Sequence, residues 1–372
     1  TGVITAAGTL GQIIPPSIVL ILLGDVISNA YQQSQLKMGI FSPDTVSVGD
    51  LFAGSLFPGL LLVSLYILYQ FLKAIFDPSS TPEIIIEESD LSYKELFKTL
   101  FPPLTLIIAV LGSILTGFAT PTEAASVGAI GSILLAANRI AKENFLTLVS
   151  ALSFLALLAL NFLFDLRLNR DDLNLFENIS IIIAVIVFII FLISTVLCIY
   201  RLFLSGVLVD AARSSTKITS MVFIILIGAT FFSLVFRGLG GDETIEHFLT
   251  NLPGGTFSAI LIVMISMFLL GFFLDFIEIT FVVVPIVAPI ILQMGIDPVW
   301  LGVMMAINLQ TSFLTPPFGF ALFYLRGVAP DSVRTSEIYR GVIPFIIIQM
   351  FMLILLSTFP SIATWLPSYI FN

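Results

Sequence analysis

Long apolar runs separated by short polar stretches dominate the pattern of hydrophobic and polar positions along this chain. A helix of about 20 apolar residues crosses the hydrocarbon core of a bilayer, which is roughly 30 Å thick. We predict that the uninterrupted runs form membrane-spanning scaffold helices, because each is nearly free of charge and ends at a polar break. They are Leu51–Leu72, Phe145–Phe164, Ile179–Tyr200, Ile218–Phe236 and Val342–Phe359.

The remaining apolar runs carry Pro, Gly, Thr or acidic residues in their interior. They are Ile4–Val26, Leu104–Ala137, Ala259–Leu292 and Val299–Leu325. Lipid cannot satisfy the backbone N–H and C=O groups at such a break, so the break persists only where protein or a hydrated cavity supplies partners. In secondary transporters, discontinuous helices of this kind form the substrate and ion sites.

Composition supports an integral membrane protein and excludes several other classes. Of the 372 residues, 58% are hydrophobic and 10% are charged, whereas a soluble domain has about 45–50% apolar and about 25% charged residues. The lone Cys198 and His247 exclude a disulfide framework and a thiolate or His-built metal site. The net charge of −9 argues against a nucleic-acid partner. We find no phosphate-binding loop and no dinucleotide-binding motif, which argues against ATP hydrolysis.

Charged and aromatic residues outside the apolar runs suggest the topology. Basic residues in the loops at 73–98, 139–142 and 213–217 favour a cytoplasmic location for these loops. Arg237 and Arg326 end apolar runs, where they can snorkel to a headgroup or contact an anionic substrate, and snorkelling is favoured. His247 lies in an acidic loop and is predicted to be a surface residue. The aromatic residues predicted to anchor the chain at the membrane interface are Trp300, Trp365, Tyr339 and Tyr369.

Two of the broken runs repeat the same pattern in the two halves of the chain. The first reads Gly8-Thr9-Leu10-Gly11-Gln12-Ile13-Ile14-Pro15-Pro16-Ser17 and continues into an apolar half-helix that ends at Gly24. The second reads Asn308-Leu309-Gln310-Thr311-Ser312-Phe313-Leu314-Thr315-Pro316-Pro317-Phe318-Gly319 and continues into a half-helix that ends at Gly327. Paired breaks in corresponding halves are typical of inverted-repeat transporters.

Each proline pair is predicted to end one half-helix and to open the next. The second proline suits the first helical turn, and the residue before a proline avoids the helical conformation. Residues 8–12 and 310–315 are therefore expected to be unwound and to present carbonyl and hydroxyl oxygens, which can replace the water shell of Na⁺. The alternative is a pair of simple proline kinks, which the match between the two breaks disfavours.

A third motif, Thr120-Pro121-Thr122-Glu123, has the pattern of a helix capping box with proline at the first helical position. One interpretation is an ordinary, well-capped helix. The other is a capped end at membrane depth, where its N–H groups face an anion or line the transport pathway. The sequence leaves both open.

Asp275 and Glu278 are carboxylates with apolar neighbours, three residues apart and so on one face if the segment is helical. Intramembrane carboxylates are costly and are functional by default, so we predict that they line the pathway, bind a cation or carry a proton. The alternative is a hairpin tip at the membrane surface, where both are solvated.

Together, these motifs resemble the large membrane subunit of the tripartite ATP-independent periplasmic (TRAP) transporters. The resemblance rests on the two Pro-Pro motifs, on Thr120–Ala125, on Leu274–Glu278 and on the run Phe320–Pro330, in this order and over nearly the whole chain. It implies an all-α polytopic membrane protein with an inverted-repeat, elevator-type fold, discontinuous helices and re-entrant hairpins. It also implies Na⁺-driven import of an organic acid and no other cofactor.

The resemblance further implies two partners, a periplasmic binding protein that delivers substrate and a small four-helix membrane subunit that joins the scaffold. The region Asp275–Pro289 is similar to the second hairpin. The cation-binding residues that the resemblance implies are Gly8, Thr9, Gly11, Asn308, Gln310, Thr311, Ser312 and Thr315. The residues expected along the substrate pathway are Pro15, Pro16, Ser17, Thr120, Thr122, Glu123, Asp275, Glu278, Pro316, Pro317 and Gly319.

The sequence departs from the family pattern in two places. The first hairpin is expected upstream of Thr1, which leads us to expect that an N-terminal part of the natural protein precedes this sequence and completes one ion site. The stretch Asn138–Val207 is longer than in compact members by about two spans. The chain is thus divided into a first discontinuous helix (1–30), a scaffold helix and charged loop (51–100), a broken helix (101–137), extra scaffold helices (138–217), a helix and polar loop (218–256), the second half of the transport domain (257–330) and a C-terminal helix (331–372).

The sequence therefore predicts a sodium-coupled importer of a small carboxylate in the bacterial inner membrane, surrounded by lipid. Proton coupling through Asp275 or Glu278 is an alternative within transport. An intramembrane enzyme that uses these two carboxylates, and a passive channel, are the rival classes.

Overall fold

A computed structural model of the chain describes residues 1–78, 93–140, 145–167, 175–330 and 332–371, and in these ranges the regular elements are all helices. The chain divides into two compact units. The first contains residues 1–85, 113–121 and 221–372, and the second contains residues 86–112 and 122–220. The all-α fold expected from the sequence is confirmed.

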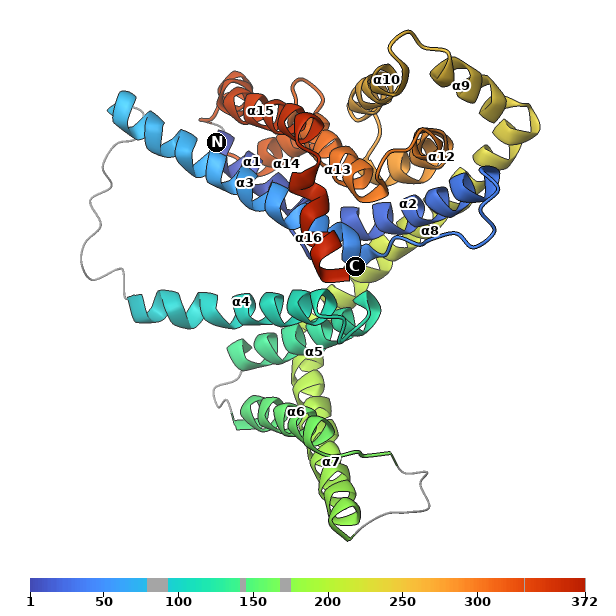
Figure 1. The fold of residues 1–372 in the computed structure, drawn as a ribbon. Helices are drawn as coiled ribbons and strands as arrows, with labels where there is room; N and C mark the ends of the chain where they lie inside the picture. The colour runs from blue at the N-terminus through green and yellow to red at the C-terminus, as the bar shows by residue number, and fades with distance from the viewer. Residues whose placement is uncertain (79–92, 141–144, 168–174, 331, 372) are drawn as a thin grey trace. The chain divides into compact units, whose positions relative to one another are not determined.

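The second unit consists of long apolar helices. They are α4 (Tyr93–Leu115, whose last residues belong to the first unit), α5 (Pro121–Ile140), α6 (Phe145–Leu163), α7 (Leu175–Leu204) and the start of α8 (Val207–Gly238). Helices α6 and α7 pack side by side (Figure 1), and the hydroxyls of Ser150 and Thr195 lie 2.7 Å apart between them. Cys198 of α7 is buried against α5. The stretch 138–217 thus supplies a helical pair and the start of a third helix.

The first unit contains the two proline pairs and the hairpin between them (Figure 1). Its elements are α1 (Gly2–Thr9), the 3₁₀ turn η1 (Leu10–Gln12), α2 (Ile18–Lys37), α3 (Val48–Phe76), α9 (Gly241–Thr250), α10 (Gly255–Leu270), α11 (Phe276–Glu278), the π-helical turn η3 (Ile279–Val283), α12 (Val284–Gln293), α13 (Pro298–Leu314), α14 (Phe320–Val328), α15 (Thr335–Thr358) and α16 (Ser361–Phe371).

Helix α13 is the core of the first unit. Every residue of α13 except Phe313 is buried, and the helix contacts α1, α2, α3, α10, α14, α15 and α16. Helix α1 packs against α15, where Gly2 and Gly341 bring the two backbones together so closely that a Cβ at Gly2 would overlap the Gly341 carbonyl. Small residues allow such approaches between membrane helices. The core is therefore built around one of the two broken helices.

Local sequence explains where several of these helices begin. Ser47 caps α3, because its hydroxyl accepts from the Asp50 N–H at 3.1 Å while the Asp50 carboxylate accepts from the Ser47 N–H at 2.7 Å. Asp297 caps α13 by accepting from the Trp300 N–H at 2.8 Å, and Pro298 occupies the first helical position. Both arrangements satisfy N–H groups that a helix start otherwise leaves unpaired.

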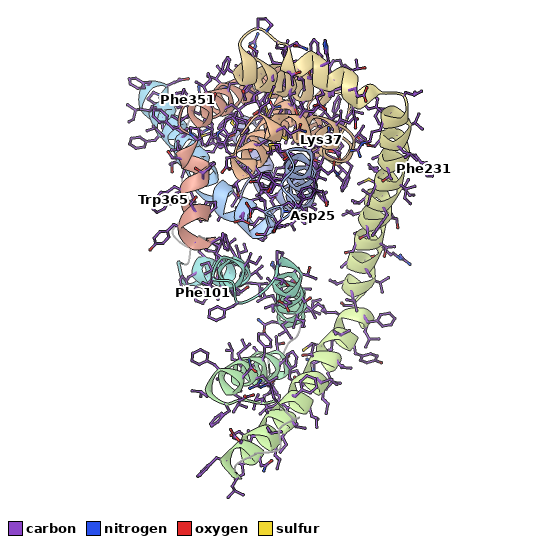
Figure 2. All side chains as sticks on the ribbon, turned by 45° about the vertical axis from the view of Figure 1, so that its right-hand side comes forward. Asp25, Lys37, Phe101, Phe231, Phe351 and Trp365 are labelled. Atoms are coloured by element: carbon purple, nitrogen blue, oxygen red, sulfur yellow. The ribbon has the colours of Figure 1, made fainter. Side chains whose placement is uncertain are left out.

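Among the described residues, seven helices are long and apolar enough to cross a bilayer. The five uninterrupted runs of the sequence coincide with parts of α3, α6, α7, α8 and α15, to within one residue at Phe164 and Phe359. The other two spans are Glu95–Leu115 and Phe276–Gln293. Aromatic side chains point outward from several helices (Figure 2), where a bilayer would supply their contacts. Examples are Phe101, Phe231, Phe351 and Trp365.

The structure corrects one sequence prediction about interfacial groups. Trp300 is buried rather than interfacial, and its indole N–H donates to the Leu356 carbonyl at 2.8 Å. The Arg237 guanidinium pairs with Asp242 at 3.0 Å, and Arg326 donates to the carbonyl of Val333. Contact of either arginine with a headgroup stays a prediction. His247 is exposed, as predicted.

Candidate functional site

The first break lies between α1 and α2, and it is shorter than the sequence suggested. Gly8 and Thr9 are helical, Leu10–Gln12 form a 3₁₀ turn, and α2 begins at Ile18 after Ser17. The Ser17 hydroxyl donates to the Gln12 carbonyl at 2.6 Å and accepts from the Leu20 N–H at 3.4 Å. The prediction that Pro16 opens the second half-helix is therefore wrong. Ser17 opens it, because its hydroxyl satisfies an N–H that proline cannot.

The second break begins at Thr315, so the prediction that residues 310–315 are unwound is wrong for all but the last of them. Helix α13 runs to Leu314, and α14 begins at Phe320 after Gly319. Thr315 is extended (φ −84°, ψ 125°) because the proline that follows excludes it from the helical conformation. Gly319 is required at the turn, since a Cβ there would lie 2.6 Å from the Phe313 carbonyl oxygen. Pro316 and Pro317 both lie inside the turn.

Hydroxyl groups on the last turns of α13 are bonded to their own helix. Thr311 donates to the Ile307 carbonyl at 2.7 Å, Ser312 to the Leu309 carbonyl at 2.9 Å, and Thr315 to the Thr311 carbonyl at 2.7 Å. Such bonds use the single hydroxyl hydrogen and leave oxygen lone pairs free to accept. Thr311 and Ser312 are buried. These hydroxyls therefore offer acceptor oxygens in a desolvated place without unwinding the helix.

The predicted cation-binding residues of α13 fall on two faces of the helix. At 3.6 residues per turn, residues 308, 311, 312 and 315 share one face, and residue 310 lies on the opposite face. The side chains agree, since Asn308 donates to the Met264 carbonyl of α10 at 2.8 Å, whereas Gln310 reaches α1. Asn308 and Gln310 therefore contact different helices, α10 and α1, on opposite sides of α13.

Gln310 joins the two breaks directly. Its side-chain amide Nε2 donates to the hydroxyl oxygen of Thr9 at 3.3 Å, across 301 positions of sequence, and both residues are buried. The Thr9 hydroxyl donates its own hydrogen to the Ala6 carbonyl at 2.9 Å, so it can only accept from Gln310. This fixes the amide with its Nε2 toward Thr9. The repeated motifs thus meet in space.

At this junction, Gln310 Oε1 has no partner among the described residues. Gln12 Oε1, on the 3₁₀ turn that follows Thr9 in the sequence, has none either. A buried amide oxygen without a partner costs about 1–3 kcal/mol, and native structures rarely retain one without a water, ion or ligand. The donor set suits a hard cation such as Na⁺, which prefers neutral and anionic oxygens.

The hairpin between the breaks is longer than predicted and its tip lies at the second break. It comprises α10, a turn at 271–275 and the arm α11–α12, so the predicted Asp275–Pro289 is only part of one arm. A Cβ at Gly271 would overlap Ser312 Oγ and lie 2.8 Å from Ser312 Cβ. The centroids of the Phe273 and Phe318 rings lie 5.5 Å apart, with the rings tilted by 35°. The hairpin tip therefore packs on the hydroxyl face of α13.

Asp275 and Glu278 form the cap of the second hairpin arm. The Asp275 carboxylate accepts from the Phe276 N–H at 2.7 Å, and the Glu278 carboxylate accepts from the Asp275 N–H at 2.6 Å. Both side chains are half-buried. They lie at a hairpin tip, as in the alternative left open by the sequence, but they bond to backbone rather than only to solvent. Further along this arm, the buried Thr280 hydroxyl in the π-helical turn has no partner among the described residues.

Most of the remaining predicted residues are exposed. Gly8 and Gly11 are exposed, and a Cβ at either would meet nothing within 4 Å. Pro15 is buried and Pro16 is exposed. Helix α5 begins at Pro121, as expected for the third motif, and Thr120, Thr122 and Glu123 around its start are exposed. Their place along a pathway stays a prediction.

Sequence reasoning missed Gln12, Gly271 and Thr280 as members of the site. Gln12 lay inside the first motif but was not selected, although an amide in an otherwise apolar run is a usable signal. Gly271 was identifiable only through its contact with Ser312. Thr280 carried no signal, because a helical threonine normally bonds to its own backbone.

Comparison with known proteins agrees with this arrangement. The family model described as the DctM component of the tripartite ATP-independent periplasmic transporters matches residues 1–164 and 174–362. The chain is 28% identical to a C4-dicarboxylate TRAP transporter large permease of Vibrio cholerae over 99% of its own length and 67% of that protein. It is 25% identical to the sialic acid large permease of the same species (98% and 66%) and 23% identical to an ectoine/5-hydroxyectoine large permease of Ruegeria pomeroyi (99% and 67%).

The match covers both proline pairs, the hairpin between them and most of the second unit. The chain spans about two thirds of the length of these curated relatives. The family match therefore includes both breaks and the hairpin, in the order in which the structure has them, and extends over nearly the whole chain. The chain belongs to the DctM family, the large permease component of the tripartite ATP-independent periplasmic transporters.

Proposed function

We propose that this protein imports a small organic acid across the bacterial inner membrane by Na⁺ symport, with an elevator-type movement of the half that holds the breaks and the hairpin. The observation that carries the proposal is the junction at which Gln310 bonds to Thr9. It joins the two breaks through two buried side chains that carry acceptor oxygens, and this supports a site for a small cation. Membership of the family and seven candidate spans make the chain a multi-pass inner-membrane permease and not an enzyme.

The two opposite faces of α13 support two roles in the proposed transport cycle. On one face, Gln310 and Thr9 would hold a cation with the help of backbone carbonyls near Gly8 and Gly11. On the other face, Ser312 lies against the hairpin tip at Gly271, and Thr311 and Thr315 share this face of α13. A cation on this second face would be covered by the hairpin, so ion binding and hairpin position would be coupled.

The substrate proposal rests on the names of the relatives. Those relatives are named for C4-dicarboxylate, sialic acid and ectoine. Dicarboxylates and sialic acid are organic acids, so we assign a carboxylate to this chain as well. The partially charged N–H groups at the starts of α2 and α14 would meet its negative charge, because helix N-termini attract anions.

The proposed partners follow from the tripartite description of the family. One is a periplasmic binding protein that delivers the substrate, and the other is a small four-helix membrane subunit. Helix α8 is an apolar span with most of its side chains exposed, so it has surface available for lipid or for another membrane helix.

The proposal is tested by uptake into proteoliposomes that contain the natural permease with both partners. A panel of labelled organic acids is supplied with an inward Na⁺ gradient, with K⁺ in place of Na⁺, and with a proton gradient alone. Uptake that requires Na⁺ supports the proposal. Uptake that continues with K⁺ and follows the proton gradient supports proton coupling instead, and flux in both directions without any gradient supports a channel.

A further inference from the structure

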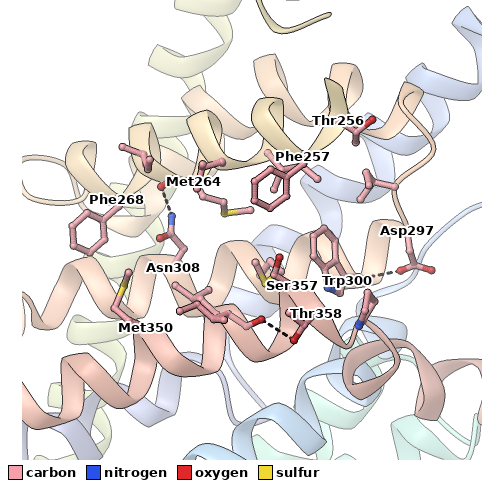
Figure 3. Close-up of a pocket in the computed structure, with 18 of the residues that line it drawn as sticks. Thr256, Phe257, Met264, Phe268, Asp297, Trp300, Asn308, Met350, Ser357 and Thr358 are labelled. Atoms are coloured by element: carbon pink, nitrogen blue, oxygen red, sulfur yellow. Dashed lines mark hydrogen bonds between the residues drawn. The ribbon is translucent and has the colours of Figure 1, made fainter. Parts of the chain in front are cut away.

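A cavity of about 710 Å³ lies between α10, α13 and α15, and Asn308 is the one predicted cation-binding residue that lines it. This volume is within the range of small-molecule sites, roughly 300–1,000 Å³. Figure 3 shows its elongated arrangement, with Thr256 and Asp297 at one end and Asn308, Phe268 and Met350 at the other. All of these elements belong to the first unit.

The walls of the cavity are apolar along its length. Side chains from all three helices contribute, and the main ones are Phe257, Leu261 and Ile265 of α10, Met304 of α13, and Met350 and Ile354 of α15. Helix α15 is itself a candidate membrane span. An apolar cavity between such helices favours a ligand with a long hydrocarbon body, because burying that body removes apolar surface from water.

Asp297 is the charged residue among those that line the cavity. It lies at one end with Thr256, whereas Ser357 and Thr358 lie between this end and the middle, and the amide of Asn308 lies toward the other end (Figure 3). One oxygen of Asp297 accepts from the Trp300 N–H, and the Thr358 hydroxyl donates to the Ile354 carbonyl at 3.1 Å, so both groups face a ligand as acceptors. No Lys, Arg or His is among the described residues that line the cavity.

We propose that this cavity binds an acyl chain of a membrane phospholipid whose headgroup carries an ammonium group, with the ammonium beside Asp297. A carboxylate with hydroxyl acceptors attracts an ammonium group, and it repels a purely anionic headgroup that finds no cation to pair with. Phosphatidylethanolamine has the required chemistry and phosphatidylglycerol lacks it. The bound chain lies against α10, which is the first arm of the hairpin, and so links the hairpin to the surrounding lipid.

The two tryptophans of the chain make this proposal testable by fluorescence. Trp300 lines the cavity, whereas Trp365 lies exposed on α16. In a Trp365→Phe background, Trp300 is the only indole within residues 1–372, and any tryptophan outside these residues is also replaced by phenylalanine. The protein is reconstituted in vesicles with equal amounts of phosphatidylethanolamine and phosphatidylglycerol, and only one of the two lipids carries brominated acyl chains, which quench indole fluorescence. We expect quenching by brominated phosphatidylethanolamine to exceed quenching by brominated phosphatidylglycerol, with a preference of about fivefold for one charge at a membrane surface.

Two variants test the site itself. Asp297→Asn retains the cap of α13, because asparagine caps as well as aspartate, and should abolish the preference between the two lipids. Ile354→Phe narrows the cavity and should remove most of the quenching. Its control is Ile347→Phe, since Ile347 lies on the same helix, is equally exposed (62% against 60%) and does not line the cavity.

Each outcome decides the proposal. Equal quenching by the two lipids, or a preference that survives Asp297→Asn, overturns it, because the headgroup is then not recognised at Asp297. Quenching that is the same in Ile354→Phe and Ile347→Phe also overturns it, because the quencher is then in the bulk bilayer. Preferential quenching that is lost in both Asp297→Asn and Ile354→Phe but kept in Ile347→Phe supports it.

Discussion

The amide of Gln310 donates to the hydroxyl of Thr9 at 3.3 Å, so a single buried hydrogen bond joins the first broken helix to the second across 301 sequence positions. Both side chains lie within the repeated motifs. The bond leaves the Gln310 amide oxygen unpaired among the described residues. The same contact therefore holds the breaks together and presents an oxygen for a cation.

Loss of this bond should be measurable as a coupling between the two residues. Thr9→Val removes the hydroxyl at nearly constant shape and leaves the Gln310 amide buried without an acceptor, at a cost of about 1–3 kcal/mol. Gln310→Met should cost much less stability when it is added to Thr9→Val than when it is made in the unaltered protein. In the double variant, no buried polar group is left without its partner. Thermal unfolding with and without Na⁺ measures both effects, and stabilisation by Na⁺ should shrink in each variant. Thr230→Val, at an exposed helical position with an ordinary bond to its own helix, is the control, and additive costs for the double variant would contradict the coupling.

Ser312→Ala should weaken Na⁺ dependence more than it affects expression, as should Thr311→Ala. Both remove an acceptor oxygen on the helix face that meets the hairpin tip at Ser312, while leaving the helix intact. Ser55 provides a matched control, because it is equally buried and donates to the carbonyl three residues earlier in the same way. The Na⁺ concentration for half-maximal uptake should rise for Ser312→Ala and not for Ser55→Ala. An unchanged Na⁺ requirement in both site variants would show that these hydroxyls are not ligands.

Gly271→Ala should push the hairpin tip away from the second break. The added Cβ would overlap Ser312 Oγ, and overpacking of this kind typically costs about 1–3 kcal/mol. We expect a strong loss of uptake and a lower unfolding temperature. The double variant Gly271→Ala/Ser312→Gly removes the clash and should regain stability but not Na⁺ affinity. Gly228→Ala is the control. An added Cβ at Gly228 meets nothing within 4 Å, so this change should not lower the unfolding temperature.

Glu278→Gln separates the capping role of this carboxylate from a role in proton transfer. Glutamine retains an oxygen that can accept from the Asp275 N–H, so the helix cap persists. If Glu278 is only a cap, uptake and its pH profile stay close to those of the unaltered protein, while Glu278→Ala lowers both stability and uptake. Loss of uptake in Glu278→Gln with normal expression would instead favour proton coupling through this group.

Trp300→Phe should destabilise the protein far more than Trp365→Phe. The first change leaves the buried Leu356 carbonyl without its donor, at a cost of about 1–3 kcal/mol. The second removes only an exposed ring that stacks on Tyr369. Unfolding temperatures of the two single variants provide the test, and equal values would mean that the Trp300 bond contributes little.

The sequence by itself determined the class of fold, the membrane spans and the order of breaks and hairpin. These features are local, because a run of apolar residues predicts a span and a proline excludes its predecessor from a helix. The five uninterrupted runs coincide with parts of five of the long helices for this reason. The paired motifs were visible for the same reason, since each is a continuous stretch of chain.

Tertiary structure decided which side chains meet and where each helix resumes. Helix α13 continues through Asn308–Leu314 because its hydroxyls bond to its own backbone and its neighbours bury it, and this places Gln310 opposite Asn308. Trp300 is buried because α15 supplies an acceptor for its indole N–H. Such contacts join residues that are distant in sequence, and a local sequence pattern does not indicate which distant residue a side chain will contact. The physical reason is that local propensity selects the helix, whereas hydrogen-bond satisfaction and packing between helices select its faces.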